Sequence, residues 1–545
     1  MDLFRKQFIG NMTWYALAGI VITHVLAIFV RDSAFALPAL IIIGVLTLYI
    51  SFKSLPHGLF IGFVEVFTGG HGHLIDTEIF GFSLSIRMVI FAAVMFGWLI
   101  LIIRKQTEIK IIKLRDLPWV TLITAIAVGT AIGFINNEPM KVFDDMNGYL
   151  AIGYILPLLS INWNSVMKRD LLHVLFGSAI WLVFFTLLLS ALFNHLDGKT
   201  SSHVYTFVRD ARLAEITLQK YEDPNFEDCW DLCAVAEFEG EIPACCGSTP
   251  VIAYGYRIFM QSQFFLVTTI LIIFAAMLFI WRSQRAPAMP VVSFVFISSA
   301  LILSLSRSFA LGLAAGGAML IALSFFHGKK SLPNVSRRLL YSVILAGFGA
   351  SLVIGTALIP PKPDITDASF YQSSDDGERE LAISSRWQLL PEMMKSIAKS
   401  PIIGSGFGTE VTFISDDPRV RAINPSGEWT TYRFEWGYQD IWLKMGVLGL
   451  IAFGWYAVLI FQAIRFTMKK HGHVWLTIGF GAGVLALFVA NVFTPFLNHP
   501  IGIITMLLII PFLDFEGMEK QAQEARQARK VKKGALEMSP AMIEA

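Results

Sequence analysis

Long apolar stretches separated by short polar segments run through most of the chain. A helix that crosses the hydrocarbon core of a bilayer needs roughly 20 apolar residues, because each residue adds about 1.5 Å to its length. The pattern therefore predicts an all-α membrane bundle of about 12–14 transmembrane helices with two large extracytoplasmic loops. One apolar stretch, Pro56 to Thr68, is too short for a straight crossing. The other predicted spans are Thr13 to Val30, Ala34 to Phe52, Leu84 to Ile103, Leu117 to Ile135, Gly148 to Val166, Leu171 to Phe193, Phe259 to Trp281, Met289 to Leu305, Phe309 to Phe326, Leu339 to Ile359, Asp440 to Ala463, Val474 to Phe493 and Pro500 to Leu513.

Lys and Arg collect in clusters between these spans, and such clusters mark the cytoplasmic side of a membrane protein. From Leu84 onward, every cluster falls on one side when the helices alternate in direction. The N-terminus shares that side only if Pro56 to Thr68 also crosses, and otherwise the first two helices are inverted. No small-residue cleavage site follows the first apolar stretch, so we expect a retained helix and not a removed signal peptide.

This threading divides the chain into six segments. They are N-terminal transmembrane helices over 1–193, an extracytoplasmic Cys-containing loop over 194–258, transmembrane helices over 259–359, a second extracytoplasmic loop with an amphipathic helix over 360–439, C-terminal transmembrane helices over 440–514 and a basic cytoplasmic tail over 515–545.

Composition agrees with a chain whose surroundings are mostly lipid. Hydrophobic residues make up 55% of the 545 residues and charged residues only 15%, whereas soluble domains carry about 25% charged residues. The mean hydropathy is +0.61. A formal net charge of +2 lacks the strongly basic balance of a nucleic-acid-binding protein. The net charge therefore says little about function, and the positions of individual charged residues along the chain must be considered instead.

All four cysteines fall in the first large loop. Thiols on the oxidising side of a bacterial-type membrane favour disulfides, and four cysteines allow three pairings that the sequence does not distinguish. We expect disulfides that staple a loop without a core of its own. The alternative is a zinc site, which is disfavoured because the cluster lacks a second CxxC pair and a nearby His. The cysteines are Cys229, Cys233, Cys245 and Cys246.

Arg307 is the first candidate for chemistry. It lies in SLSRSFALGL, at the outer junction of two apolar helices that are joined by almost no loop. An arginine keeps its proton there and presents a planar fork of donors, which suits a phosphate at the membrane surface. The alternative is an interface arginine that only snorkels towards water.

The second large loop contains an amphipathic stretch that Arg386 opens. Its apolar residues recur near helical spacing, so we expect a helix that lies on the bilayer or caps the bundle. The GSGFG motif that follows predicts a tight turn and not a dinucleotide-binding loop, because no strand precedes it. The apolar residues are Leu389, Leu390, Met393, Met394 and Ile397.

Arg433, Glu435 and Asp440 crowd the start of the next membrane helix, together with aromatic residues. This crowd is either an interfacial belt or a place where a carboxylate base meets a membrane-bound substrate. Three polar residues elsewhere are given less weight. Asp144 and Asp145 are interpreted as solvated loop residues, and His499 as an interface histidine, with a place along the acceptor path as its alternative.

The segment before the third confident helix holds Arg87, about one turn into that helix from its outer face. Arg87 is interpreted as a further phosphate contact or as a partner of Glu65. His71 and His73 lie near Asp76, but histidines one residue apart on a Gly-rich loop are more often hydrogen-bonded than metal-ligating. We therefore expect no metal site.

Three of these stretches together resemble a known family. The SxSR pair of helices, an outer loop that opens with R-W-x-x-L, a P-x-x-G-x-G-x-G-like turn and a re-entering helix with GVLGL are similar to the O-antigen ligase and O-antigen polymerase superfamily of bacterial cell-envelope glycosyltransferases. The resemblance covers roughly Val291 to Ile464. It implies a multi-pass enzyme of the bacterial cytoplasmic (inner) membrane with its active face in the periplasm.

The resemblance also implies the substrates. Members transfer a glycan from undecaprenyl diphosphate to lipid A core or to another glycan chain, without a cofactor. It places Arg307 and Arg386 on the donor diphosphate, and Arg433 and Arg87 join them as substrate-binding candidates. Membrane lipids and other polysaccharide assembly proteins are expected partners, and nucleic acid is not.

One position departs from the ligases, which usually carry a His-Asn pair just before the re-entering helix. This chain has Glu435 and Trp436 there, so the choice between polymerase and ligase stays open. We expect Glu435, Arg307 and Arg386 to be catalytic, with Glu435 as the base towards an acceptor hydroxyl in a metal-independent reaction.

Two other function classes compete with the enzyme. A transporter or flippase for lipid-linked sugars would carry out no chemistry and would show broken helices in related halves with charges near the membrane midplane. A structural assembly factor would leave Arg307 and Arg386 replaceable. The enzyme is favoured because the notable charges gather on the outer face beside the large loops.

Overall fold

The computed structural model describes residues 8–79, 82–196, 198–222, 251–279, 288–326, 332–359, 376–470 and 475–538. Within these ranges, nine helices are long and apolar enough to cross a membrane, and a bent pair after residue 500 would make a tenth. Three shorter apolar helices accompany them. The predicted all-α polytopic bundle is confirmed, and about 12–14 crossings are reached if the shorter helices and the bent pair also cross.

The long apolar helices form the body of the bundle. They are α2 (Asn11–Val30), α3 (Ala36–Lys53), α5 (Ile86–Ile103), α6 (Lys113–Asn136), α9 (Ser165–His195), α12 (Phe264–Phe279), α14 (Arg307–Phe326), α15 (Leu332–Leu358) and α18 (Gly437–Lys470). The shorter apolar helices are α4 (Leu55–Thr68), α13 (Ala288–Ser304) and α19 (Trp475–Ala490). One member of the bent pair is α20 (Pro500–Leu508) with η5 (Ile510–Phe512), and the other is α21 (Phe515–Met538).

The remaining elements are short or lie at the ends of the bundle. They are α7 (Pro139–Met146), η1 (Asn147–Tyr154), α8 (Ile155–Ser160), α10 (Gly198–Asp210), η2 (Gln261–Gln263), α16 (Asp376–Lys399), α17 (Pro418–Ile423) and η4 (Phe496–Asn498). The described ranges also contain three antiparallel strand pairs, which the all-α interpretation did not include: β1 (Asp76–Ile79) with β2 (Phe82–Ser85), β3 (Glu215–Glu222) with β4 (Val251–Phe259) and β5 (Val411–Ile414) with β6 (Glu428–Thr431).

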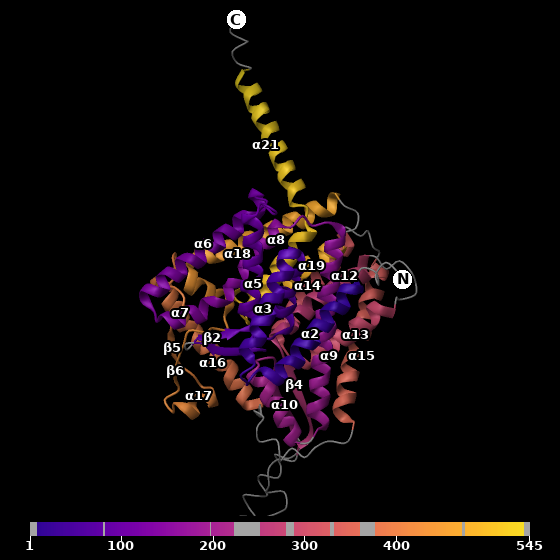
Figure 1. Cartoon of the computed structure of the whole chain (residues 1–545), viewed down its shortest axis with the longest axis vertical. Helices are drawn as coiled ribbons and strands as arrows, with labels where there is room; N and C mark the ends of the chain where they lie inside the picture. Colours follow the sequence, from indigo (N-terminus) through magenta and orange to yellow (C-terminus); the bar gives the residue numbers. More distant parts are fainter. Residues whose placement is uncertain are drawn as a thin grey trace, which may run out of the picture.

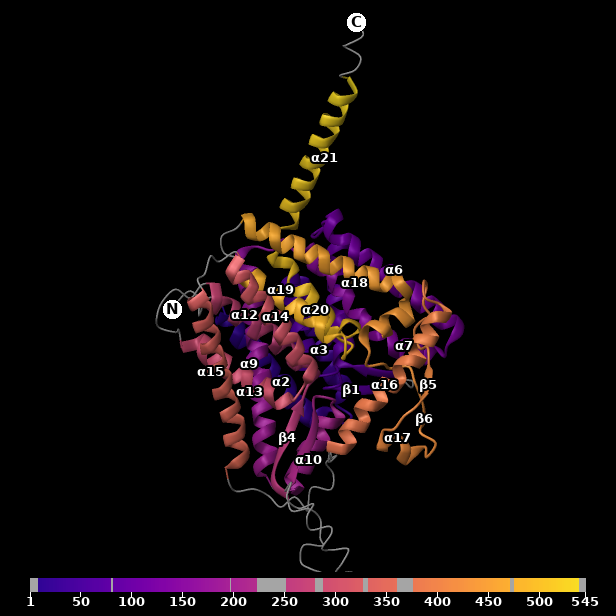
Figure 2. The ribbon, with the colours of Figure 1, turned by 180° about the vertical axis from the view of Figure 1, so that it is seen from behind.

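The molecule has two distinct ends (Figures 1 and 2). Helix α21 projects from one of them, which we call the tail end, and α10, β4 and α17 lie at the opposite end, which we call the loop end. The second predicted loop contributes α16, β5, α17 and β6 to the same half as the loop end. The four cysteines and their predicted disulfides lie outside the described residues.

Helix α4 runs between the two ends of α5. Arg104, just after α5, stacks over the ring of Phe52, with 4.8 Å to the ring centroid, and Phe52 lies in the last turn of α3, just before α4 begins. At the other end of α5, Arg87 pairs with Glu65 near the end of α4, at 2.8 Å. A 14-residue helix spans about 21 Å. The short apolar stretch therefore bridges both ends of its neighbour, which is the condition for the N-terminus to share the tail end with the basic clusters.

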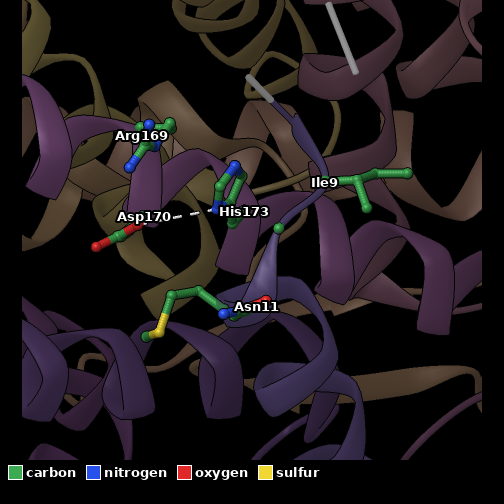
Figure 3. A pocket seen from close by; sticks show the side chains of 7 residues that line it. Ile9, Asn11, Arg169, Asp170 and His173 are labelled. Atoms are coloured by element: carbon green, nitrogen blue, oxygen red, sulfur yellow. Dashed lines mark ion pairs between the residues drawn. The ribbon is translucent and has the colours of Figure 1, made fainter. Parts of the chain in front are cut away.

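Contacts at the two ends of α2 show which end of the bundle each one lies at, and those at its start are drawn in Figure 3. Ile9 and Asn11 line a pocket of about 320 Å³ with Arg169, Asp170 and His173 from the start of α9. His173 Nδ1 lies 3.8 Å from Asp170 Oδ1. The other end of α2 reaches α10 at the loop end, where the Arg31 guanidinium donates to the Asp210 carbonyl. The pocket therefore opens at the tail end.

The predicted span from Gly148 to Val166 is wrong as a single helix. The structure has the 3-10 helix η1, the six-residue α8 and a short loop before α9 begins at Ser165. Gly148 and Gly153 favour helix formation less than other residues, and Pro157 interrupts the hydrogen-bond pattern. Gly148 also lies directly against the Asn498 carbonyl, so the start of this stretch packs against the break between α19 and α20.

Candidate functional site

Arg307 is the first residue of α14, at a junction of two residues after α13. Leu305 makes the turn with a left-handed φ of 46°. The hydroxyls of Ser306 and Ser308 lie 3.1 Å apart beside it, and the Ser306 amide donates to Ser304 Oγ at 3.3 Å. Arg307 is exposed, and its guanidinium has no ion pair or hydrogen bond within the described part of the chain. The charge is therefore free to meet a ligand.

Helix α16 is amphipathic as predicted, and it caps the bundle through a small core of its own. Leu389, Met393 and Ile397 are buried, Leu390 is half-buried and Met394 is 40% exposed. This face packs against the β5–β6 hairpin and the start of α18 and so does not depend on the bilayer. The buried partners on those elements are Val411, Phe413, Phe434, Trp436 and Leu443.

Arg386 and Glu435, which the sequence analysis selected separately, form an ion pair. Each side chain is 50% exposed, so the pair stands at the surface of the loop-end half. Trp436 Nε1 donates to the Arg386 carbonyl at 2.9 Å, and Trp387 packs edge-to-face on Trp436 with centroids 4.8 Å apart. Because these contacts tie the backbone of α16 to the residues before α18, the two charges are held together.

The break between α19 and α20 connects this pair to Arg307. Thr494 Oγ1 lies 3.0 Å from Ser308 Oγ, next to Arg307. One residue earlier, Phe493 packs against Trp436, next to Glu435, with ring centroids 5.6 Å apart. The chain neighbours of Arg307 and Glu435 therefore contact adjacent residues of one short segment, although they come from separate stretches of sequence.

A buried ionic network supports the same region. Lys444 Nζ in α18 lies 2.5 Å from Asp440 Oδ1 and 2.6 Å from Asp145 Oδ1, and it donates to the Tyr432 carbonyl at 3.1 Å. The three charged side chains are between 1% and 6% exposed. Asn498 Nδ2 in turn donates to Asp440 Oδ2 at 2.6 Å. One ammonium thus joins α7, α18 and the segment 432–436 before α18, which we call the strap.

The interpretation of Asp145 as a solvated loop residue is wrong. Helix α7 folds against the second loop, where Asp145 Oδ2 accepts from the Gly408 amide at 2.8 Å and Oδ1 meets Lys444. Sequence reasoning did not identify Lys444, although its position four residues after Asp440 is the spacing of an ion pair on one helix face.

The GSGFG segment is a structural turn, as predicted. The Ser405 amide donates to the Leu443 carbonyl at 2.7 Å, and the Phe407 amide donates to the Gly129 carbonyl in α6 at 3.1 Å. The Phe407 carbonyl accepts from Asn137 Nδ2 at 2.8 Å. Its backbone is therefore occupied by contacts with α6 and α18.

Arg87 takes the second of its two predicted roles. Its Nε donates to Glu65 Oε2 at 2.8 Å, and Nη2 donates to the Gly70 carbonyl at 2.8 Å. Arg433 is exposed and lies over the ring of Tyr432, 5.3 Å from its centroid. Arg87 thus holds a turn of the loop end, while Arg433 faces out beside Glu435.

Comparison with known proteins gives one family. A family model described as O-antigen ligase matches residues 292–454, close to the range of the resemblance found in the sequence. No curated protein matches the chain. The matched range contains Arg307, Arg386, Arg433 and Glu435, and it leaves out Arg87 and the cysteine-containing loop. Residues 292–454 are therefore similar to the O-antigen ligase family, which agrees with the resemblance of the sequence to the O-antigen ligase and O-antigen polymerase superfamily.

Proposed function

We propose that this protein is a metal-independent glycosyltransferase that moves a glycan from an undecaprenyl-diphosphate-linked donor to a glycan or lipid acceptor. The O-antigen ligase match supports membrane glycosyl transfer in general. The observation that carries the finer proposal is the Arg386–Glu435 pair, whose neighbour Trp436 contacts the same short segment as Ser308, next to Arg307. Two cations and a carboxylate at one place fit a diphosphate leaving group and an acceptor hydroxyl.

The active face is proposed to be periplasmic, in the bacterial cytoplasmic membrane. Basic residues gather at the tail end, where Lys110 pairs with Glu516 and Lys470 pairs with Asp514 at the start of α21. Because short cytoplasmic segments are enriched in Lys and Arg, the tail end is assigned to the cytoplasm. The loop end, with Arg307 and Arg386, then faces the periplasm.

In the proposed reaction, Arg307 and Arg386 bind the donor diphosphate. An oxygen of the acceptor hydroxyl attacks the anomeric carbon from the face opposite the diphosphate, and the bond from that carbon to the diphosphate oxygen breaks. The diphosphate leaves with the electron pair, and the two guanidinium groups stabilise the charge that develops on it. Glu435 accepts the hydroxyl proton, and the anomeric configuration inverts.

The resting ion pair adds a requirement to this reaction. While Arg386 holds Glu435, the carboxylate is engaged and the guanidinium is partly neutralised. A diphosphate that takes over Arg386 frees Glu435 for the acceptor hydroxyl. Donor binding would therefore free Glu435 to act as the base, so that a proton is removed from the acceptor only when the donor is bound.

Arg307→Ala and Arg386→Ala should each lower glycan transfer by about 10²–10³-fold, because a charge that stabilises the leaving diphosphate is lost. Both proteins should still be present in the membrane at the wild-type level. The measurement is transfer from a lipid-linked donor in membranes that contain equal amounts of each variant. Arg421→Ala is the control, because Arg421 is an exposed arginine of the same loop that pairs with Asp416. Unchanged transfer in both test variants would remove the diphosphate assignment.

Glu435→Gln should lower the turnover of bound donor by about 10²-fold or more, because the base is lost. Donor affinity should be retained or improved, since the freed Arg386 no longer has a competing carboxylate. Glu435→Asp should keep part of the turnover. Single-turnover transfer and donor binding, measured separately, distinguish the two effects. Full turnover in both variants would show that Glu435 is not the base.

A further inference from the structure

A short turn at the loop end presents His71 in a fixed position. The turn follows α4, and its glycines Gly70 and Gly72 have left-handed φ values of 59° and 91°. The His71 amide donates to the Arg212 carbonyl at 3.3 Å, and a Cβ on Gly72 would lie 2.8 Å from the Cβ of Arg87. Larger residues would not fit on either side of His71, which itself keeps an exposed surface.

A second histidine packs against it from the far end of the chain. The rings of His71 and His499 meet edge-to-face, with centroids 5.7 Å apart. His499 Nδ1 accepts a hydrogen bond from the Ile501 amide at 3.3 Å, at the start of α20. The proton of neutral His499 is therefore on Nε2, where it is a hydrogen-bond donor.

The acidic groups around this turn already have partners. Glu65 accepts from Arg87 at 2.8 Å, and Asp76 lies 2.9 Å from His73 Nδ1. Arg212 and Arg433 are both exposed, and neither has an acidic partner in the described ranges. Arg212 adjoins the turn through its carbonyl, and Arg433 acts on His71 through its charge, so two cations near the turn have no carboxylate partner in those ranges.

The uncompensated charge acts on His71. Although the residue keeps an exposed surface, the pKa of His71 is lowered to about 4. The largest cause is loss of water around the ring, and the positive charges of Arg87, Arg212, His73 and Arg433 add to it. Burial likewise lowers the pKa of His499 well below its ordinary value, with His71 and Arg87 adding to the effect. Both imidazoles are therefore neutral near pH 7.

We propose that the 69–73 turn, Arg212, Arg433 and His499 form a second binding site, which takes an oxyanion, a carboxylate or a phosphate, carried by the acceptor glycan. The donors are two guanidinium groups and the Nε2 proton of His499, which together suit an oxyanion. Arg433 also lies two residues from Glu435, on the same exposed face of the strap, so the site adjoins the proposed base.

The assignment to the acceptor rests on the proposed glycosyl transfer, in which Arg307 and Arg386 are already used by the donor. Apart from Arg433, the contributing residues lie outside the matched range 292–454. Recognition of the acceptor would therefore depend on the N-terminal and C-terminal parts of the chain. The transfer chemistry would depend on residues 292–454.

The test measures binding of three soluble probes to the full-length protein in lipid nanodiscs: sodium glucuronate, inorganic phosphate and methyl glucoside. We expect at least one of the two anions to bind, and the preferred one identifies carboxylate or phosphate. The neutral sugar should bind at least tenfold more weakly, because it offers no charge. Arg212→Gln and Arg433→Gln should each weaken anion binding about tenfold. Arg209→Gln is the matched control, because Arg209 is exposed but paired with Asp210 at 2.8 Å.

The pH dependence gives a second measurement. A bound anion offsets the positive charges around His71 and so raises its pKa from about 4. Because the complex then binds more protons than the free protein, glucuronate should bind more tightly at pH 5.5 than at pH 7.5. His71→Gln should remove this dependence, because the group that takes up the proton is lost.

Three outcomes would overturn the proposal: wild-type anion binding in both arginine variants, equal binding of methyl glucoside, or loss of anion binding in Arg307→Gln instead, which would locate the anion at the donor site. Failure of the proposed function is a separate result. Anion binding that depends on Arg212, in a protein that transfers no glycan, would keep the site and reject the transferase.

Discussion

Lys444→Met should lower the free energy of unfolding by about 3–5 kcal/mol, because it leaves the buried carboxylates of Asp145 and Asp440 without their cation. The Lys444 side chain is 3% exposed, and its ammonium lies within 2.6 Å of an oxygen of each carboxylate. The two carboxylates would then repel each other at a place that water does not reach. The loss should appear as a lower unfolding temperature in detergent and as reduced glycan transfer.

Two variants show whether the loss comes from the buried charges. Asp145→Asn in the Lys444→Met background should recover part of the stability, because it removes one of the two stranded charges. Lys395→Met should cost less than about 1 kcal/mol, since the Lys395 side chain is 70% exposed where it pairs with Glu392. If Lys444→Met and Lys395→Met unfold at the same temperature, the network does not stabilise the protein.

The bundle was predictable because apolar stretches of spanning length have few alternatives. The amphipathic face of α16 was also visible, since Leu389, Met393 and Ile397 recur at helical spacing. The stretch from Gly148 was misread because hydropathy does not register where a helix is interrupted. Its glycines and Pro157 were signs of the interruption that the sequence contains. The close contact between Gly148 and the Asn498 carbonyl is visible only in the structure.

The candidate site was predictable residue by residue but not as an arrangement. Arg386 and Glu435 were selected as a phosphate ligand and a base, and nothing in their local sequence indicated that they pair. Asp145 was misassigned because its partner, Lys444, lies far along the chain. Contacts of this kind depend on how α6 and α7 pack against the second loop, which is a property of the tertiary fold. The ring contact between His71 and His499 is another such contact.

Gly446→Ala should destabilise the protein by at least about 3 kcal/mol and abolish most glycan transfer. Gly446 interrupts α18 with φ 63° and ψ −163°, a conformation open to glycine almost alone. A Cβ there would overlap the carbonyl group of Ile402. The break also lets the Val447 amide donate to the Pro401 and Ile402 carbonyls, at 3.1 and 3.2 Å, which fixes the chain just after α16.

Gly454→Ala is the matched control, because Gly454 lies in the same helix and a Cβ there would meet no atom within 4 Å. This variant should keep full transfer and gain up to about 1 kcal/mol, since alanine favours a helix more than glycine does. The unfolding temperatures and transfer rates of the two variants should therefore change in opposite directions or differ widely. Equal stability and equal transfer in the two variants would mean that α18 continues straight through Gly446. If the break is present, Gly446→Ala should remove the hydrogen bonds between Val447 and the turn after α16. Arg386 should then lose the anchoring that holds it beside Glu435.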